Sequence, residues 1–171
     1  MFTQAIRSNA VRLESGAGVF IAKGLGHAYF EGVKLSVKSD YATRAVLALA
    51  RYYPDGRARR AEELALEQGI PANYLVQILI LLKAKQIVKS LRGKDGGYLL
   101  ARSPAEISLG DILRSIHGEV FESPALHDAQ CPGELRGAWQ KLQQAVEAAA
   151  DAITFQSLLD AGSAEEKMFY I

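Results

Sequence analysis

The chain has 171 residues, of which 49% are hydrophobic and 23% charged, and its net charge is +1. These values are typical of a globular protein large enough for one domain with a real core, alone or with an appendage. No apolar run approaches the roughly 18 residues that a membrane span needs, and the patch at 18–22 is too short for a secretory signal, so we expect no membrane contact. The single cysteine, Cys131, excludes a disulfide framework and indicates a reducing, cytoplasmic location.

The small net charge hides an asymmetry between two parts of the chain. Residues 33–102 contain thirteen Lys or Arg and six Asp or Glu, a net charge of +7. Residues 103–171 contain four basic and eleven acidic residues, a net charge of −7. A basic half favours a polyanionic partner, and double-stranded DNA is the expected one.

Residues 1–32 show no clear hydrophobic period and carry five glycines. Their Gly-x-Gly pairs are not a phosphate-binding loop, because neither a preceding strand nor a following helix is visible. We expect a poorly ordered N-terminal extension or an over-extended gene start that folding does not need. Arg7 and Arg12 leave an organelle-type leader as the alternative.

The first helix is predicted over 39–53. It opens with Ser39 and Asp40, which are good N-cap residues, and repeats apolar residues at helical spacing. A Pro-Asp-Gly turn ends it. A short second helix follows over 61–69, and we expect Gly69 to end it in the left-handed conformation.

A third helix is predicted over 73–85, only three residues later, with Asn73 as its cap. The runs on either side of a glycine-rich turn then predict two strands of a hairpin. The predicted elements follow the order of a winged helix-turn-helix: two helices, a tight turn, a third helix and a hairpin. The predicted fold class is therefore mainly α with a small β-hairpin, followed by a long C-terminal dimerisation helix.

The C-terminal part begins with a helix over 108–118, where Ser108 and Asp111 are spaced as a capping box. An irregular segment precedes a long helix over 134–152, and Thr154 is a plausible cap for a last short helix over 155–161. The long helix carries an apolar stripe that needs a partner, either a second copy of the chain or its own domain. We expect a homodimer that buries the stripe Trp139, Leu142, Val146 and Ile153.

Three glycines and four cations surround the expected hairpin turn in the sequence LRGKDGGYLLAR at 91–102 and just before it. Glycine gives a positive φ or a close backbone approach, and basic residues at the same turn favour an anion, although a solvated turn is the alternative. In a winged helix-turn-helix the hairpin reaches the flanking DNA backbone while the second helix of the motif enters the major groove. We therefore expect phosphate contacts at the wing from Arg92, Gly93, Lys94, Gly96 and Gly97.

The helix over 73–85 is the expected recognition helix. Its spacing directs Asn73, Val76, Gln77 and Ile80 outward. The two amides suit bidentate recognition of adenine, whereas the two aliphatic side chains suit thymine methyl groups or a protein surface. The opposite face is predicted to lie in the core with Leu75, Ile78, Leu79 and Leu82.

Three blocks of the sequence, at 33–50, 69–102 and 107–118, resemble the Rrf-two family of bacterial winged-helix transcriptional regulators. That group includes an iron–sulfur cluster biogenesis regulator, a nitric-oxide-sensing repressor and a cysteine-metabolism repressor. The resemblance covers about residues 33–160 and implies a homodimer that binds a palindromic operator, and we expect a repressor. It also implies DNA contacts from Lys38, Tyr41 and Tyr74.

The chain departs from the family pattern at two places in these blocks. Where the family has Lys-Gly-Arg-Tyr, the chain has Lys38-Ser39-Asp40-Tyr41, so an acid replaces a potential phosphate contact. Where the family has Tyr-Leu-Glu-Gln, Val76 replaces the Glu. The operator sequence therefore cannot be taken from relatives. We divide the chain into four parts: an extension at 1–32, a winged-helix domain at 33–118, a loop at 119–133, and a dimerisation helix and tail at 134–171.

Cluster-binding members of the family carry three cysteines in the loop, and this chain has only Cys131. An iron–sulfur cluster needs four ligands, and His117, His127 and nearby acids are a poor substitute. We predict no cofactor and no metal site. Two inputs stay open: a cluster held by Cys131 with non-cysteine ligands, or a non-cluster signal such as a small molecule, a protein or oxidation of Cys131.

A second function class is also open: a winged-helix protein-interaction module that has lost DNA reading, as Asp40, Val76 and Ile80 suggest. Salt-dependent retention on heparin or random DNA separates the two classes. We do not expect an enzyme, because no nucleophile–base pair, carboxylate pair or phosphate loop stands out.

Overall fold

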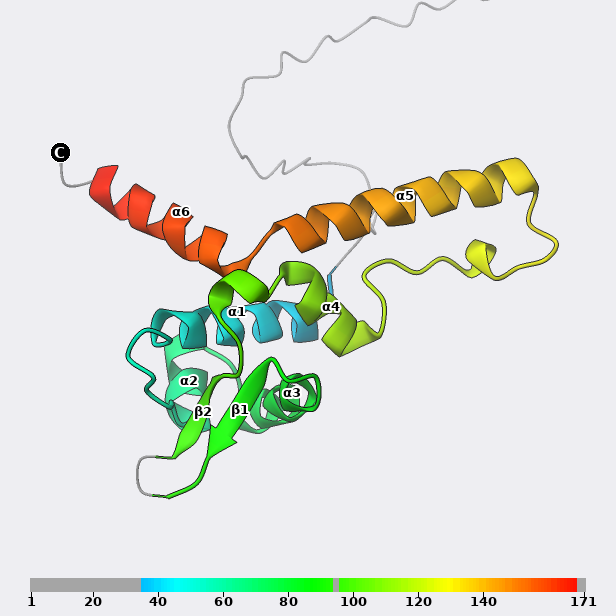
Figure 1. Cartoon of the computed structure of the whole chain (residues 1–171). Coiled ribbons are helices and arrows are strands. Elements are labelled where there is room, and N and C mark those ends of the chain that lie inside the picture. The colour runs from blue at the N-terminus through cyan, green and yellow to red at the C-terminus, as the bar shows by residue number, and fades with distance from the viewer. Residues whose placement is uncertain (1–34, 94–95, 169–171) are drawn as a thin grey trace, which may run out of the picture. The chain divides into compact units, whose positions relative to one another are not determined.

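The structure is a computed structural model that describes residues 35–93 and 96–168, with side chains up to residue 164. Its elements have the winged helix-turn-helix order that the sequence predicts, followed by further helices (Figure 1). The extension expected over 1–32, and Lys94 of the wing, lie outside the described residues. The elements are α1 (Val37–Arg51), α2 (Ala61–Gln68), α3 (Ala72–Ala84), β1 (Val88–Leu91), β2 (Gly97–Leu100), η1 (Pro104–Glu106), α4 (Leu109–His117), η2 (Pro124–Leu126), α5 (Gly133–Ala152) and α6 (Phe155–Met168).

The core lies where α1, α2, α3, α4 and α6 meet. On α3, the four residues predicted to face inward are fully buried, which confirms the helical period read from the sequence. Phe155, the first residue of α6, is also fully buried in this cluster, so the C-terminal segment closes the same core as the winged helix. The expected limits of the four parts stay predictions.

The first helix begins earlier than predicted. Ser36, rather than Ser39 or Asp40, is the N-cap, and its hydroxyl accepts a hydrogen bond from the Ser39 backbone N–H at 3.1 Å. Ser39 lies inside the helix, buried, where its hydroxyl contacts Nε2 of His117. Both serines at the start of α1 therefore contact the last residue of α4, which lies far away in the sequence.

Four further helix ends test the local signals. Gly69 ends α2 with a φ of +64°, and Ser108 and Asp111 form the capping box of α4, as predicted. Asn73 is not the cap of α3: that position is Pro71, and Asn73 lies exposed in the first turn. Thr154 does cap α6, because its hydroxyl accepts from the Ser157 N–H at 3.1 Å.

The wing is a two-stranded antiparallel hairpin in which Val88 pairs with Leu100 and Leu91 pairs with Gly97. Arg59, in the loop between α1 and α2, pairs with Tyr98 as an isolated bridge on the other edge of β2. Its backbone N–H donates to the Tyr98 carbonyl at 2.8 Å and its carbonyl accepts from the Tyr98 N–H at 2.8 Å. The loop therefore adds a one-residue third strand to the wing.

The turn between α5 and α6 is joined to α4 by backbone and side chains. The Leu109 N–H donates to the Ile153 carbonyl at 2.8 Å, and the Phe155 N–H donates to the Ile107 carbonyl at 3.0 Å. Helix α6 continues to residue 168, beyond the predicted end at 161, and packs against α1 and η1. This contact gives the long α5 a fixed attachment to the winged helix at one end.

Within the described residues, no single helix is long and apolar enough to cross a membrane. Taken together, α2 and α3 reach that length and apolar content, but they meet at a bend of 114°. Both lend residues to the core, among them Leu64 and Leu75.

Candidate nucleic-acid interface

Helix α3, the expected recognition helix, carries both polar and apolar side chains on its outer face. Asn73 and Gln77 are exposed, as expected of residues that read base edges. Ile80 is 50% exposed, which leaves a large aliphatic side chain on the same face. Val76 is half-buried and packs against the core, so it is less available than its predicted outward position implies.

The start of α1 meets the start of α3 through two tyrosines. The rings of Tyr41 and Tyr74 lie edge to face, with centroids 5.9 Å apart. Lys38, one turn before Tyr41, is half-buried. Asp40 is exposed and pairs with Arg44 at 2.8 Å, so a cation of α1 offsets the acid that replaces the family's arginine. Six of the residues expected to contact DNA thus come from the two helices joined by this aromatic pair.

Arg92, one of the cations expected to contact phosphate at the wing, is exposed beside Gly93. Gly93 has a φ of +105° and open space around its Cα, so its glycine serves the turn conformation. At Gly96 glycine is required by internal packing, and at Gly97 by internal packing together with a positive φ of +155°. A Cβ at Gly97 would lie 2.5 Å from the Arg59 carbonyl oxygen, and one at Gly96 would lie 2.7 Å from that of Leu91.

Sequence reasoning passed over the basic residues of the loop between α1 and α2. Arg59 is largely occupied within the fold: its guanidinium pairs with Glu63 at 3.2 Å and Glu67 at 3.5 Å and stacks on Tyr52, 4.3 Å from the ring centroid. Arg57, two residues earlier, is 75% exposed. The sequence does show three arginines within four positions, at 57–60, which marks a basic segment. Only the pairing of Arg59 with Tyr98 of β2 shows that this segment lies beside the wing.

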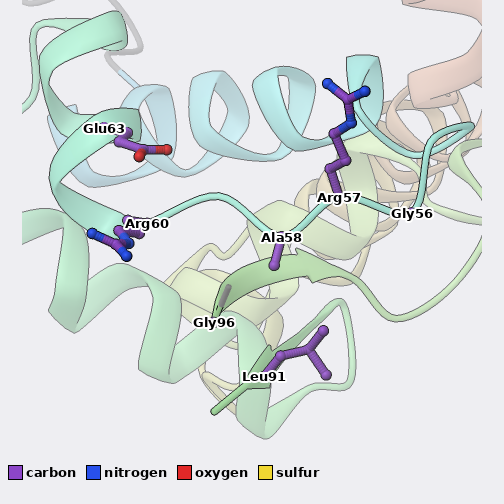
Figure 2. Close-up of a pocket in the computed structure, with 7 residues that line it drawn as sticks. All are labelled: Gly56, Arg57, Ala58, Arg60, Glu63, Leu91 and Gly96. Atoms are coloured by element: carbon purple, nitrogen blue, oxygen red, sulfur yellow. The ribbon is translucent and has the colours of Figure 1, made fainter. Parts of the chain in front are cut away.

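A groove of about 670 Å³ lies between this loop and the hairpin. Figure 2 shows Ala58 pointing toward Gly96, with Leu91 on the hairpin side and Arg60 and Glu63 at the start of α2. Arg57 extends from the loop on the side away from the hairpin. The groove is lined by Gly56, Arg57, Ala58, Arg60, Glu63, Leu91 and Gly96.

The expected dimerisation stripe is only partly covered within the chain. Of the twenty residues of α5, Ala150 is the only buried one, and Leu142 is 43% exposed. Trp139 is half-buried and stacks on Phe121 of the preceding loop, with centroids 6.1 Å apart. Val146 is half-buried, whereas Ile153 is exposed and caps the C-terminal end of α5.

An ion pair joins α5 to the winged helix. Arg114 of α4 donates a hydrogen bond to Asp151 of α5 at 2.6 Å, and this bond holds the pKa of the Asp151 carboxyl below its ordinary value and raises the pKa of Arg114. Asp111 accepts from Arg102, which follows β2, at 3.4 Å and lies 3.9 Å from Arg114. These four side chains connect the end of the wing with the long helix.

The loop around Cys131 is held by hydrogen bonds from the Arg136 side chain to its backbone carbonyls. Nη2 of Arg136 donates to the carbonyls of Asp128, Ala129 and Cys131 at 2.9–3.3 Å. The Cys131 thiol is 9% exposed and donates to the Pro132 carbonyl, with the two atoms 3.6 Å apart. The loop is thus ordered around the cysteine without using its sulfur as a ligand.

The comparisons with known proteins now decide the family. The sequence model of Rrf2, described as an iron-dependent transcriptional regulator, matches residues 35–161. The chain belongs to the Rrf2 family. This family is one of transcriptional regulators, and the resemblance to the Rrf-two family read from the three sequence blocks is confirmed.

Individual relatives agree with this assignment. The HTH-type regulator CymR of Bacillus subtilis is 31% identical over 141 residues, which are 81% of this chain and all of CymR. Rv1287 of Mycobacterium tuberculosis, provisionally named an HTH-type transcriptional regulator, is 44% identical over 86 residues, so the matched part of the chain spans only about half (53%) of that relative.

Solved structures confirm the fold. The CymR structure from B. subtilis has a TM-score of 0.67 at 28% identity and covers 76% of this chain and 98% of its own. The IscR structure from T. potens has a TM-score of 0.65 at 30% identity and covers 77% and 89%. The predicted winged helix-turn-helix, with its small hairpin and long C-terminal helix, is therefore confirmed as the fold class.

The family description implies iron, but the residues of this chain do not fit an iron site. Within the described part of the chain, no three His, Cys, Asp or Glu side chains are grouped so that they could hold a metal ion. Nε2 of His117 contacts the hydroxyls of Ser36 and Ser39 at the start of α1, so this nitrogen is engaged with the serines instead of sharing a metal with Cys131.

Proposed function

We propose that this chain is a transcriptional repressor that binds double-stranded DNA as a homodimer on a palindromic operator. In this proposal α3 enters the major groove, where Asn73 and Gln77 read base edges, and the wing places Arg92 and Lys94 on flanking phosphates. The observation that carries the proposal is the division of α3: four side chains anchor it in the core, while its polar residues are exposed beside the Tyr41–Tyr74 contact.

The dimer is proposed from the state of α5. A twenty-residue helix that buries only one residue in its own chain leaves its apolar stripe available to a second copy. Two copies related by a twofold axis would present two α3 helices to two half-sites, which explains why the operator is expected to be palindromic.

The wing assignment is tested by the salt dependence of DNA binding. Replacing Arg92 and Lys94 together with Ala should lower affinity for specific and random duplexes alike. The slope of log K against log salt should become shallower by about 2, because each lost phosphate contact contributes about 0.9. The matched control replaces two exposed cations elsewhere, Arg51 and Lys141, with Ala and should keep the wild-type slope. Equal slopes for wing and control variants would reject the assignment.

Base reading is tested separately with Gln77→Ala. Its effect should fall mainly on the preference for a selected site over random DNA, because a base contact carries sequence information and a phosphate contact does not. An equal loss of affinity on both kinds of DNA would argue against a base contact by Gln77.

The alternative of a protein-interaction module rests on the exposed apolar side chains of Tyr74, Ile80 and Leu91. It requires that the wild-type chain show no salt-dependent retention on heparin or random DNA. Retention that falls steeply with salt would favour the DNA-binding proposal. The input that controls binding is proposed to be a small molecule, a protein or oxidation of Cys131, without a three-cysteine cluster.

A further inference from the structure

Helix α5 is attached to the winged helix at its C-terminal end. Figure 1 shows this helix extending beyond α1 and α4, with its last turns beside α4. The Leu109 N–H donates to the Ile153 carbonyl at 2.8 Å, and the Phe155 N–H donates to the Ile107 carbonyl at 3.0 Å. These two backbone bonds hold the turn after α5 and act as a pivot. The direction in which α5 leaves this turn therefore depends on side-chain contacts with α4.

Asp151, in the last turn of α5, meets the first turns of α4. Its carboxylate accepts a hydrogen bond from Arg114 at 2.6 Å and one from the Ser108 hydroxyl at 3.3 Å. The carboxylate also lies over Gly110, where a Cβ would collide with Oδ1 of Asp151. Because this oxygen is the end of a flexible side chain, Gly110→Ala would push the carboxylate aside and leave the backbone in place. Two directed hydrogen bonds and the bare surface of a glycine thus give this carboxylate a fixed position on α4.

Arg114 attracts two acids that lie one turn apart on α5. Glu147 and Asp151 are four residues apart, and like charges at this spacing repel each other on a helix. The hydrogen bond with Asp151 and the charge of Glu147 both raise the pKa of Arg114. Farther along, α5 contacts the irregular loop after α4 through Trp139. The contact at Arg114 joins α5 to a helix of the winged-helix domain, which restrains its direction more firmly than a loop does.

The direction of α5 matters in a dimer because this helix separates the two DNA-binding halves. Its twenty residues span about 30 Å, so a tilt of about 10° at the attached end displaces the other end by roughly 5 Å. One added base pair of B-DNA moves the next half-site by about 3.4 Å and turns it by roughly 35° around the axis. A small tilt of α5 would therefore shift one recognition helix by more than one base pair relative to the other.

We propose that Asp151, Arg114 and Gly110 determine the half-site separation that the dimer accepts, because they hold α5 at one angle to the winged helix. They are positioning residues that act through α5 and are not expected to touch DNA. The inference rests on the proposed homodimer on a palindromic operator and deepens it, since it names residues that select the operator spacing. A partly exposed ion pair adds little to stability, whereas charge-assisted hydrogen bonds have well-defined geometry. Control of an angle is therefore the role that this contact suits.

The test uses a palindrome selected from a random DNA pool and duplexes with one or two base pairs inserted or removed at its centre. Wild type should bind the selected spacing about tenfold more tightly than a spacing changed by one base pair. In Asp151→Ala and in Gly110→Ala this preference should fall to about threefold or less, because α5 can then adopt several angles. Affinity for a duplex with a single half-site should stay at the wild-type value, which general damage to the fold would not allow.

Asp160→Ala is the matched control. It also removes one acid, from α6, where the carboxylate accepts a hydrogen bond from Gln156 of the same helix at 2.9 Å. This variant should keep the wild-type preference for spacing. Sedimentation should show dimers for all three variants, because the apolar stripe of α5 is unchanged.

Equal spacing preferences for Asp151→Ala, Gly110→Ala and the control would overturn the inference. An equal loss of affinity for every duplex, the single half-site included, would also overturn it, as would loss of the dimer. Either result would assign the contact to the stability of the fold or of the dimer. A wild type that binds the palindrome no better than a single half-site would refute the proposed function itself. That result is read from the wild type alone, so the two failures are distinguishable.

Discussion

Gly97 offers a sharp test of how the wing is built. If its glycine serves packing against the loop, Gly97→Ala should weaken the fold even in the absence of DNA. The added Cβ would lie 2.5 Å from the carbonyl oxygen and 2.6 Å from the carbonyl carbon of Arg59, which are backbone atoms held by two hydrogen bonds to Tyr98. Relief requires a shift of the strand or the loop, and such overpacking costs about 1–3 kcal/mol. The positive φ of +155° at Gly97 adds backbone strain to this cost, as the φ of Gly93 does.

Gly93→Ala is the matched comparison on the same hairpin. Its Cβ meets open space, so its cost is restricted to the positive φ of +105°, about 1 kcal/mol or somewhat more. Urea or thermal unfolding followed by circular dichroism measures both variants, and each kcal/mol corresponds to roughly 2–4 °C in Tm for a chain of this size. We expect Gly97→Ala to be the less stable of the two and its Arg59 amide to exchange faster with solvent. A Gly97→Ala protein as stable as wild type but weaker on DNA would refute the packing explanation and restore a direct contact with phosphate.

Two further predictions concern the long helix. Leu142→Glu places a charge on the exposed stripe of α5 and should give monomers that also lose operator binding, measured by sedimentation and by gel shift; a monomer with normal operator binding would contradict the dimer proposal. Asp151→Asn removes the partner of Arg114 and should lower the free energy of unfolding at pH 7 by about 1 kcal/mol or less, because the pair is partly exposed. The folded-state pKa of Asp151 lies below its unfolded value of about 3.8, so this stability is present above that pH and is lost as pH falls through the folded pKa. If the difference in the free energy of unfolding between wild type and Asp151→Asn already shrinks between pH 7 and pH 5, the Asp151 carboxylate is not its source.

Local signals predicted those parts of the fold that depend on neighbours in sequence. The capping box of Ser108 and Asp111, the left-handed Gly69 and the buried face of α3 all follow from spacings of a few residues. The start of α1 did not follow, because Ser36, Ser39 and Asp40 are all good caps. The choice of Ser36 coincides with the contact of His117, about eighty residues away, with the two serines.

The interface was harder to predict because its shape depends on one long-range pairing. The bridge between Arg59 and Tyr98 involves a single residue of the loop and therefore leaves no strand pattern in the sequence. This bridge brings the loop to the wing, and the close approach of the Arg59 backbone leaves no room for a Cβ at Gly97. The end of α6 was also missed. A short helix was predicted over 155–161, whereas packing of Leu158 and Leu159 on the core accompanies a helix that continues to residue 168.

The last prediction concerns iron, where the family description and the residues of this chain disagree. A cluster needs four ligands, and a dimer would supply only two copies of Cys131. The thiol is nearly buried and directed to the Pro132 carbonyl, and the guanidinium of Arg136 spans the carbonyls of the same loop. Binding a cluster would require this loop to give up those hydrogen bonds and expose the sulfur.

We therefore expect protein purified without oxygen to be colourless, with no visible charge-transfer bands and no stoichiometric iron or sulfide. Cys131→Ser should keep the fold and the dimer, because a hydroxyl replaces the thiol at nearly the same size and can donate to the same carbonyl, at a cost of about 1 kcal/mol. Visible absorption, iron and sulfide analysis, and sedimentation of both proteins provide the measurement. A brown wild-type preparation whose colour is absent in Cys131→Ser would show that the loop opens to hold a cluster. This chain would then bind iron, as its family description implies, although it has only one cysteine.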